Sequence, residues 1–106
     1  MLLAVHAVVA CGRLGTDLDV VIAIEVSLPD SGIVAVGDTL VPRARALNGR
    51  GDSVAAPIRW AALDTGFVAV VDSMSGATVG RKPGTGRIQA RAGSLRSNPV
   101  AIIVRP

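Results

Sequence analysis

Apolar and polar residues alternate along most of the chain after residue 20, and the pattern is strictest at residues 20–28. The apolar residues of this segment occupy every second position: Val20, Ile22, Ile24, Val26 and Leu28. Because successive side chains of a strand point to opposite faces, this period of two predicts a β-strand with one buried face. The turn-forming sequence at residues 29–32, PDSG, ends the strand.

Further extended segments follow, separated by turns rich in Gly, Pro, Asp and Ser. They are expected at residues 33–36, 39–47, 58–61, 67–72, 77–81, 87–92 and 100–104, with a turn at residues 83–86 and a loop at residues 93–99. In residues 87–92, Ile88, Ala90 and Ala92 should point inward, and Arg87, Gln89 and Arg91 outward. Pro42 cannot donate a ladder hydrogen bond, so its strand should lie near a sheet edge or contain a bulge there. No stretch after residue 20 has a helical period. Short strands at this spacing predict an all-β fold, a two-sheet antiparallel β-sandwich.

The only tryptophan marks the expected centre of the core. Ile58 and Trp60 are two residues apart, so in a strand they share a face, while Arg59 and Ala61 point the other way. A large indole on the apolar face of a short strand removes much surface from water. The residues expected to form the structural core are Trp60, Val68, Val71 and Ile88.

The composition is that of one globular domain of 106 residues with few aromatic side chains, Trp60 and Phe67. Ten arginines and Lys82 outweigh eight acids, for a formal net charge of +3. The arginines are spread through the chain, whereas nucleic-acid binding calls for basic residues on one surface and for stacking aromatics. We therefore interpret them as a solvated outer face and expect no nucleic-acid partner.

The apolar run at residues 1–10, MLLAVHAVVA, ends at the only cysteine, Cys11. Ten residues are too few to span a bilayer as a helix, which needs about 20. In one interpretation residues 8–11 (VVAC) resemble the lipobox of bacterial lipoproteins, in which the cysteine receives the lipid. In the other, residues 2–10 form a buried strand and Cys11 is a small core residue. The lipoprotein interpretation, which we prefer, makes residues 1–11 a signal segment and residues 12–19 a linker, and places the protein at the cell envelope.

The polar loop at residues 48–53, NGRGDS, contains Arg50, Gly51 and Asp52, a tripeptide that integrins recognise in extracellular matrix proteins. Gly and Asp are also what a turn requires, and arginine is the usual polar residue of this chain. We prefer the interpretation of an ordinary turn and keep the three residues as a possible contact loop.

Catalytic and metal-binding residue sets are missing from the sequence. His6 is the single histidine and has no second His, Cys or paired acid at ligand spacing, so neither a catalytic triad nor a metal site is expected. Acids such as Asp64 and Asp72 lie in turns, where Asp favours local hydrogen bonds. We expect a protein without enzymatic activity or cofactors.

Residues 20–106 resemble bacterial immunoglobulin-like domains of group 2, the modules repeated in intimin- and invasin-type adhesins. The resemblance is carried by Ser27-Leu28-Pro29, Ala35–Leu40, Asn48-Gly49, Ile58-Arg59-Trp60, Val68–Asp72, Gly76, Gly84-Thr85, Ile88-Gln89-Ala90 and Val100–Pro106. It implies an immunoglobulin-like sandwich, with Gly37 and Gly84 at corners. Ala77 is smaller than the family's usual residue and Arg81 and Lys82 are basic, so residues 77–81 should form a short or irregular edge.

The resemblance implies a structural or adhesive module at the bacterial surface, acting as a spacer or an interaction domain. Its partners would be envelope proteins, neighbouring immunoglobulin-like repeats or surface polysaccharide, and it would meet a membrane only through a lipid on Cys11. Two alternatives remain, a carbohydrate-binding module and a single repeat of a larger adhesin. Carbohydrate modules use exposed aromatic platforms, so burial of the Trp60 indole would count against the first.

Overall fold

The computed structural model describes residues 20–106. The signal segment, the lipidation at Cys11 and the linker at residues 12–19, all three predicted from the sequence, lie outside the described residues.

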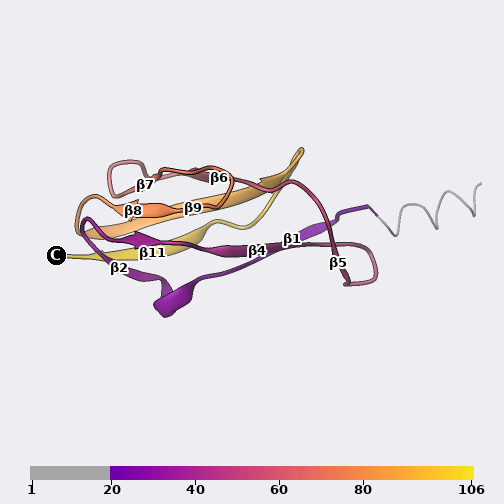
Figure 1. Cartoon of the computed structure of the whole chain (residues 1–106), viewed down its shortest axis with the longest axis horizontal. Helices are drawn as coiled ribbons and strands as arrows, with labels where there is room; N and C mark the ends of the chain where they lie inside the picture. Colours follow the sequence, from indigo (N-terminus) through magenta and orange to yellow (C-terminus); the bar gives the residue numbers. More distant parts are fainter. Residues whose placement is uncertain (1–19) are drawn as a thin grey trace, which may run out of the picture.

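The described chain is an all-β sandwich (Figure 1). Its elements are β1 (Ala23–Ser27), the 3-10 turn η1 (Pro29–Gly32), β2 (Ile33–Ala35), β3 (Thr39–Leu40), β4 (Arg43–Leu47), β5 (Ser53–Val54), β6 (Arg59–Ala62), β7 (Val68–Val70), β8 (Thr78–Gly80), β9 (Gly84–Ala92), β10 (Leu95–Arg96) and β11 (Val100–Arg105). The predicted all-β class is therefore confirmed, and the turn predicted at residues 29–32 is η1.

One layer of the sandwich is built around β9, the longest strand. Arg91 of β9 is paired with Arg59 of β6 and with Arg96 of β10, so β6 and β10 flank β9 on opposite sides. β11 continues on the β10 side, and β2 closes this layer. The β2–β11 pair is parallel, a departure from the purely antiparallel sandwich that was predicted, while the other paired strands are antiparallel.

The opposing layer consists of two short sheets, β1-β4-β5 and β3-β8-β7. The segment predicted as one strand, residues 39–47, is interrupted at Val41-Pro42, so that β3 pairs with β8 and β4 pairs with β1. The missing N–H of Pro42 explains the break. The irregularity predicted at Pro42 is therefore the point where the chain passes from the β3-β8-β7 sheet to the β1-β4-β5 sheet.

The core lies between the layers and includes Trp60, which is 6% exposed. Val68 and Ile88 are fully buried, as expected. Val71 is 64% exposed, so its assignment to the core was wrong. It lies three residues after Val68, and an odd spacing cannot place two side chains of one extended segment on the same face.

The edge strand predicted at residues 77–81 lies in the interior of its sheet. β8 is short, as expected, but it lies between β3 and β7. Thr78 is fully buried there, and its hydroxyl donates to the Gly76 carbonyl at 2.7 Å. The basic residues Arg81 and Lys82 follow the strand and are exposed, so their charge does not exclude β8 from the interior.

The glycines of β9 have a packing role that the sequence pattern did not indicate. Residues 83–86 were interpreted as a turn, yet Gly84–Gly86 begin β9. A Cβ on Gly86 would lie 2.7 Å from Cγ2 of Val68, and one on Gly84 would lie 2.5 Å from Cε1 of Phe67. The absence of side chains therefore lets the strand approach β7 closely.

The described chain begins and ends at opposite ends of the sandwich (Figure 1). The chain enters next to β1 and its C-terminus lies at the opposite end, beyond β2 and β11 (Figure 1).

Candidate functional site

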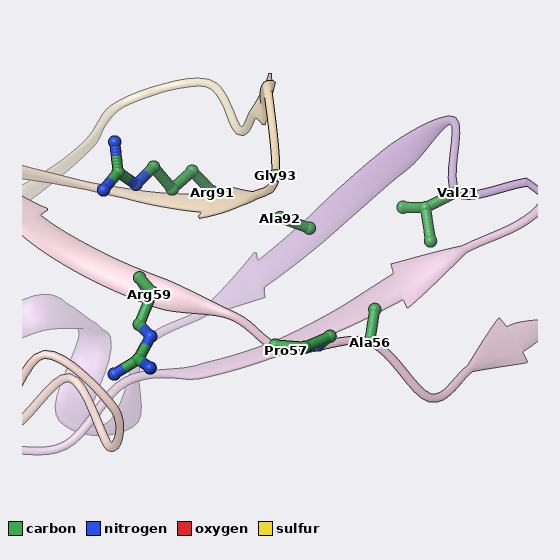
Figure 2. Close-up of a pocket in the computed structure, with 7 residues that line it drawn as sticks. All are labelled: Val21, Ala56, Pro57, Arg59, Arg91, Ala92 and Gly93. Carbon is green, nitrogen blue, oxygen red and sulfur yellow. The ribbon is translucent and has the colours of Figure 1, made fainter.

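An open groove of ≈ 610 Å³ lies beside the start of β1. It is lined by Val21, Ala56, Pro57, Arg59, Arg91, Ala92 and Gly93. Figure 2 shows the guanidinium groups of Arg59 and Arg91 on one side of the groove and the apolar Val21 and Ala56 on the other. The groove therefore has a cationic side and an apolar side.

Three arginines form a row across the outer face of the β6-β9-β10 sheet. Arg91 is the cross-strand partner of both Arg59 and Arg96, and partners in register point to the same face. All three side chains are exposed. We refer to Arg59, Arg91 and Arg96 as the arginine row.

Each backbone position of the row is fixed by a buried neighbour. Trp60, Ala90 and Ser97, adjacent in sequence to the three arginines, are all buried. Ser97 donates its N–H to the Ala90 carbonyl at 2.8 Å and accepts the Ala90 N–H on its hydroxyl at 3.0 Å. The Trp60 N–H is bound by the Ser73 carbonyl at 2.8 Å. The strands under the row are thus held in register while the guanidinium groups face solvent.

The row has no ion-pair partner within the described residues. Two other described arginines do form ion pairs: Arg45 contacts Glu25 at 2.6 Å and Arg87 contacts Asp64 at 2.8 Å. The charge of Arg59 helps to lower the pKa of Asp72, but that carboxylate is engaged mainly with backbone N–H groups of its own turn. Like charges directly opposite each other on adjacent strands destabilise a sheet.

Asp64 and Asp72 were both expected to form hydrogen bonds within their own turns, but their carboxylates have different partners. The Asp72 carboxylate accepts the Met74 N–H at 2.9 Å, which with the Ser75 N–H holds its pKa below the usual range. Asp64 instead binds Arg87, whose Nε and Nη2 donate to its two oxygens at 2.8 and 3.2 Å. That side-chain hydrogen bond lowers the pKa of Asp64 and raises that of Arg87.

The described residues that line the groove carry no group for acid–base or nucleophilic chemistry. Among them there is no carboxylate, imidazole, hydroxyl or thiol. Between residues 20 and 106, no group of three or more His, Cys, Asp or Glu is placed to hold a metal ion. In the same part of the chain, no helix has the length and apolarity needed to cross a membrane. The chemistry available at the groove is binding.

The loop with Arg50, Gly51 and Asp52 is the exposed tip between β4 and β5. The buried Asn48 organises it, because its Oδ1 accepts the N–H groups of Arg50 at 2.9 Å and of Asp52 at 3.0 Å. Gly51 has φ 83°, a conformation that favours glycine. Turn geometry therefore accounts for Gly51 without a binding role.

Neither aromatic side chain offers an open platform for sugar stacking. Trp60 is 6% exposed. Phe67 is half-buried, and Lys82 Nζ lies 5.5 Å from its ring centroid. The observation on which the carbohydrate alternative depended therefore counts against stacking of neutral sugars.

Sequence reasoning placed Arg59 and Arg91 on outer strand faces but missed the arginine row. The alternation that buries Trp60 and Ala90 already pointed the two arginines outward. Their meeting depends on the pairing of β6 with β9, segments about thirty residues apart in the sequence. Arg96 was assigned to a loop, yet it belongs to β10.

Comparison with solved structures identifies similar folds. Domains 4 and 5 of the S-layer protein SbsC match with a TM-score of 0.62 and 18% identity, over 79% of this chain and 53% of that one. Domains 5–6 of the same S-layer protein match with a TM-score of 0.63 and 19% identity, over 80% of this chain and 44% of that one. The chain thus spans about half the length of these structures. No protein-family model and no curated protein matches it.

Proposed function

We propose that the chain is a non-catalytic structural module of the bacterial cell surface, used as a spacer or interaction domain. The observation that carries this proposal is a sandwich whose chain enters and leaves at opposite ends (Figure 1) and that resembles domains of S-layer proteins. Each of these neighbours is a piece of two domains, of which this chain spans about half. An end-to-end geometry suits a repeat that extends a surface protein.

The family that we propose is the bacterial immunoglobulin-like group 2, on the motifs of residues 20–106. The proposed interaction partners are neighbouring repeats, other envelope proteins and surface polysaccharide. The groove without catalytic groups supports a role in binding or spacing.

The location is tested in the bacterium that produces the protein. A biotin reagent that cannot cross membranes is added to intact cells. It should label the natural chain at Lys82, which is exposed. A cytoplasmic protein serves as the control and should stay unlabelled. Labelling of this chain only after lysis would contradict the proposal.

We further propose that Cys11 carries a lipid that holds the module at the envelope. Each buried CH₂ of an acyl chain contributes about 0.8 kcal/mol to membrane binding. Cells fed labelled fatty acid should incorporate label into the natural protein but not into Cys11→Ser, which should leave the membrane fraction. Equal fractionation of both proteins would refute the lipid anchor and leave the surface proposal standing.

Adhesion through integrins is not part of this function. Asp52→Glu keeps the charge but lengthens the acid, so cell attachment to the purified protein should be unchanged. Selective loss of attachment in this variant would assign a role to the Arg50-Gly51-Asp52 loop.

A further inference from the structure

The arginine row is an arrangement that stability alone does not explain. Arg59, Arg91 and Arg96 occupy directly opposed positions on three neighbouring strands. Within the described residues none of the three forms an ion pair, although Arg45 and Arg87 of the same protein do. Three like charges in a cross-strand row oppose sheet formation, and a bound anion would reduce this repulsion.

We propose that the arginine row and the adjoining groove bind an anionic glycan, a sugar polymer with carboxylate or phosphate groups. This partner rests on the proposed surface function, because extracellular polymers are what a surface module meets.

The spacing of the row favours a polymer over one small anion. Neighbouring strands lie about 4.8 Å apart, so the backbones of Arg59 and Arg96 are about 10 Å apart across β9. Figure 2 shows the Arg59 and Arg91 guanidinium groups extending in different directions and not converging on one point. Successive anionic groups along a chain can meet such a row, whereas a single ion would contact only part of it.

The surroundings of the row favour a glycan over other polyanions. Val21, Ala56 and Pro57 give the groove an apolar side, against which the C–H faces of sugar rings can pack. Nucleic-acid bases require exposed aromatic side chains for stacking, and Trp60 is buried beneath the row. β9, at the centre of the row, is paired on both sides, so an acidic peptide cannot bind there by strand addition.

The test compares two variants of equal charge. The row variant carries Arg59→Gln, Arg91→Gln and Arg96→Gln. The control variant carries Arg43→Gln, Arg81→Gln and Arg105→Gln, three exposed arginines that do not line the groove. Each lowers the formal net charge from +3 to zero. Calorimetry measures the binding of the purified full chain and both variants to polygalacturonate, phosphomannan and neutral dextran.

We expect the natural chain to bind at least one anionic polymer and not dextran, with affinity falling as salt rises. The row variant should lose about tenfold or more in affinity, as three exposed charge contacts would supply, and the control variant less than about threefold. The preferred polymer then decides between carboxylate and phosphate. The unfolding temperature of the row variant should equal or exceed that of the natural chain. This result would show that its lower affinity is not caused by unfolding.

Equal losses in both variants would overturn the proposal, because binding would then follow net charge alone. So would the absence of binding to either anionic polymer, or tighter binding of a single-stranded oligonucleotide or polyglutamate than of the glycans. Surface biotinylation is independent of this experiment. A surface-exposed protein that binds no glycan would refute only the ligand, and a glycan-binding protein found inside the cell would refute the surface function.

Discussion

Trp60 is the residue on which the core depends most. Its indole is 6% exposed and packs with Leu40, Val68 and Ile88 in one buried cluster. Trp60→Ala should lower the free energy of unfolding by about 3–5 kcal/mol, since a large aromatic deletion leaves a cavity. Urea unfolding measures this loss, with Met74→Ala, a change at a 68% exposed residue, as the control. A loss below about 1 kcal/mol for Trp60→Ala would show that the core is organised otherwise.

Gly76 determines how closely a turn can approach that tryptophan. It has φ 80°, and a Cβ there would lie 2.8 Å from Pro42 Cγ and 2.9 Å from two ring atoms of Trp60. Gly76→Ala should therefore cost about 1–2 kcal/mol for the left-handed backbone and about 1–3 kcal/mol more for overpacking.

The matched control is Gly37→Ala. Gly37 has φ 87°, but nothing lies within 4 Å of the position that a Cβ would take. This variant should lose only the backbone contribution, about 1–2 kcal/mol. Urea unfolding of both variants gives the difference, and equal losses would contradict the steric role of Gly76.

At the scale of elements, the Asp64–Arg87 contact ties the β6–β7 connection to β9. Arg87 donates from its backbone N–H at 3.0 Å and from its guanidinium to the same carboxylate. These hydrogen bonds lower the pKa of Asp64 below its ordinary value of 3.8. Because the folded-state pKa is lowered, the contribution is present above about pH 4 and is lost as the pH falls through the folded-state pKa.

The natural chain should therefore lose stability between pH 7 and pH 3 partly through Asp64. Asp64→Asn should show a smaller acid-induced loss in urea unfolding at the two pH values. Arg87→Gln should be intermediate, because it keeps the backbone donor. If Asp64→Asn lost as much stability in acid as the natural chain, the contact would not be responsible.

At the scale of the whole molecule, the last strand completes the sandwich. β11 pairs with β9 on one side and with β2 on the other, and it contributes the buried Ile102 and Val104. Deletion of residues 100–106 would leave β9 unpaired along half its length and open the core. We expect the shortened chain to lose cooperative urea unfolding by circular dichroism, while deletion of the exposed Pro106 alone should change little. A cooperative transition of unchanged slope would contradict this role.

Much of the fold could be read from local pattern. Period-two alternation identified the inward faces of β6 and β9, and turn residues marked η1, because pleat and turn preferences act over neighbouring residues. In the first predicted strand it was right for Ile24, Val26 and Leu28, which pack against the core, but wrong for Val20 and Ile22, which are 52% and 57% exposed and precede β1. The failures occurred where a single residue was judged without its partners. Val71 is apolar but lies on the exposed side, and the glycines at the start of β9 are required by β7 and not by a turn.

The amino-acid sequence by itself determined the all-β class, the buried tryptophan and the outward direction of Arg59 and Arg91. Only the tertiary structure decided that the two arginines meet and that Arg96 joins them, because strand pairing brings together residues that are distant in the chain. The same holds for the central place of β8 and the parallel β2–β11 pair. Alternation specifies the face of a strand, whereas register and neighbours follow from how all the strands pack around one core.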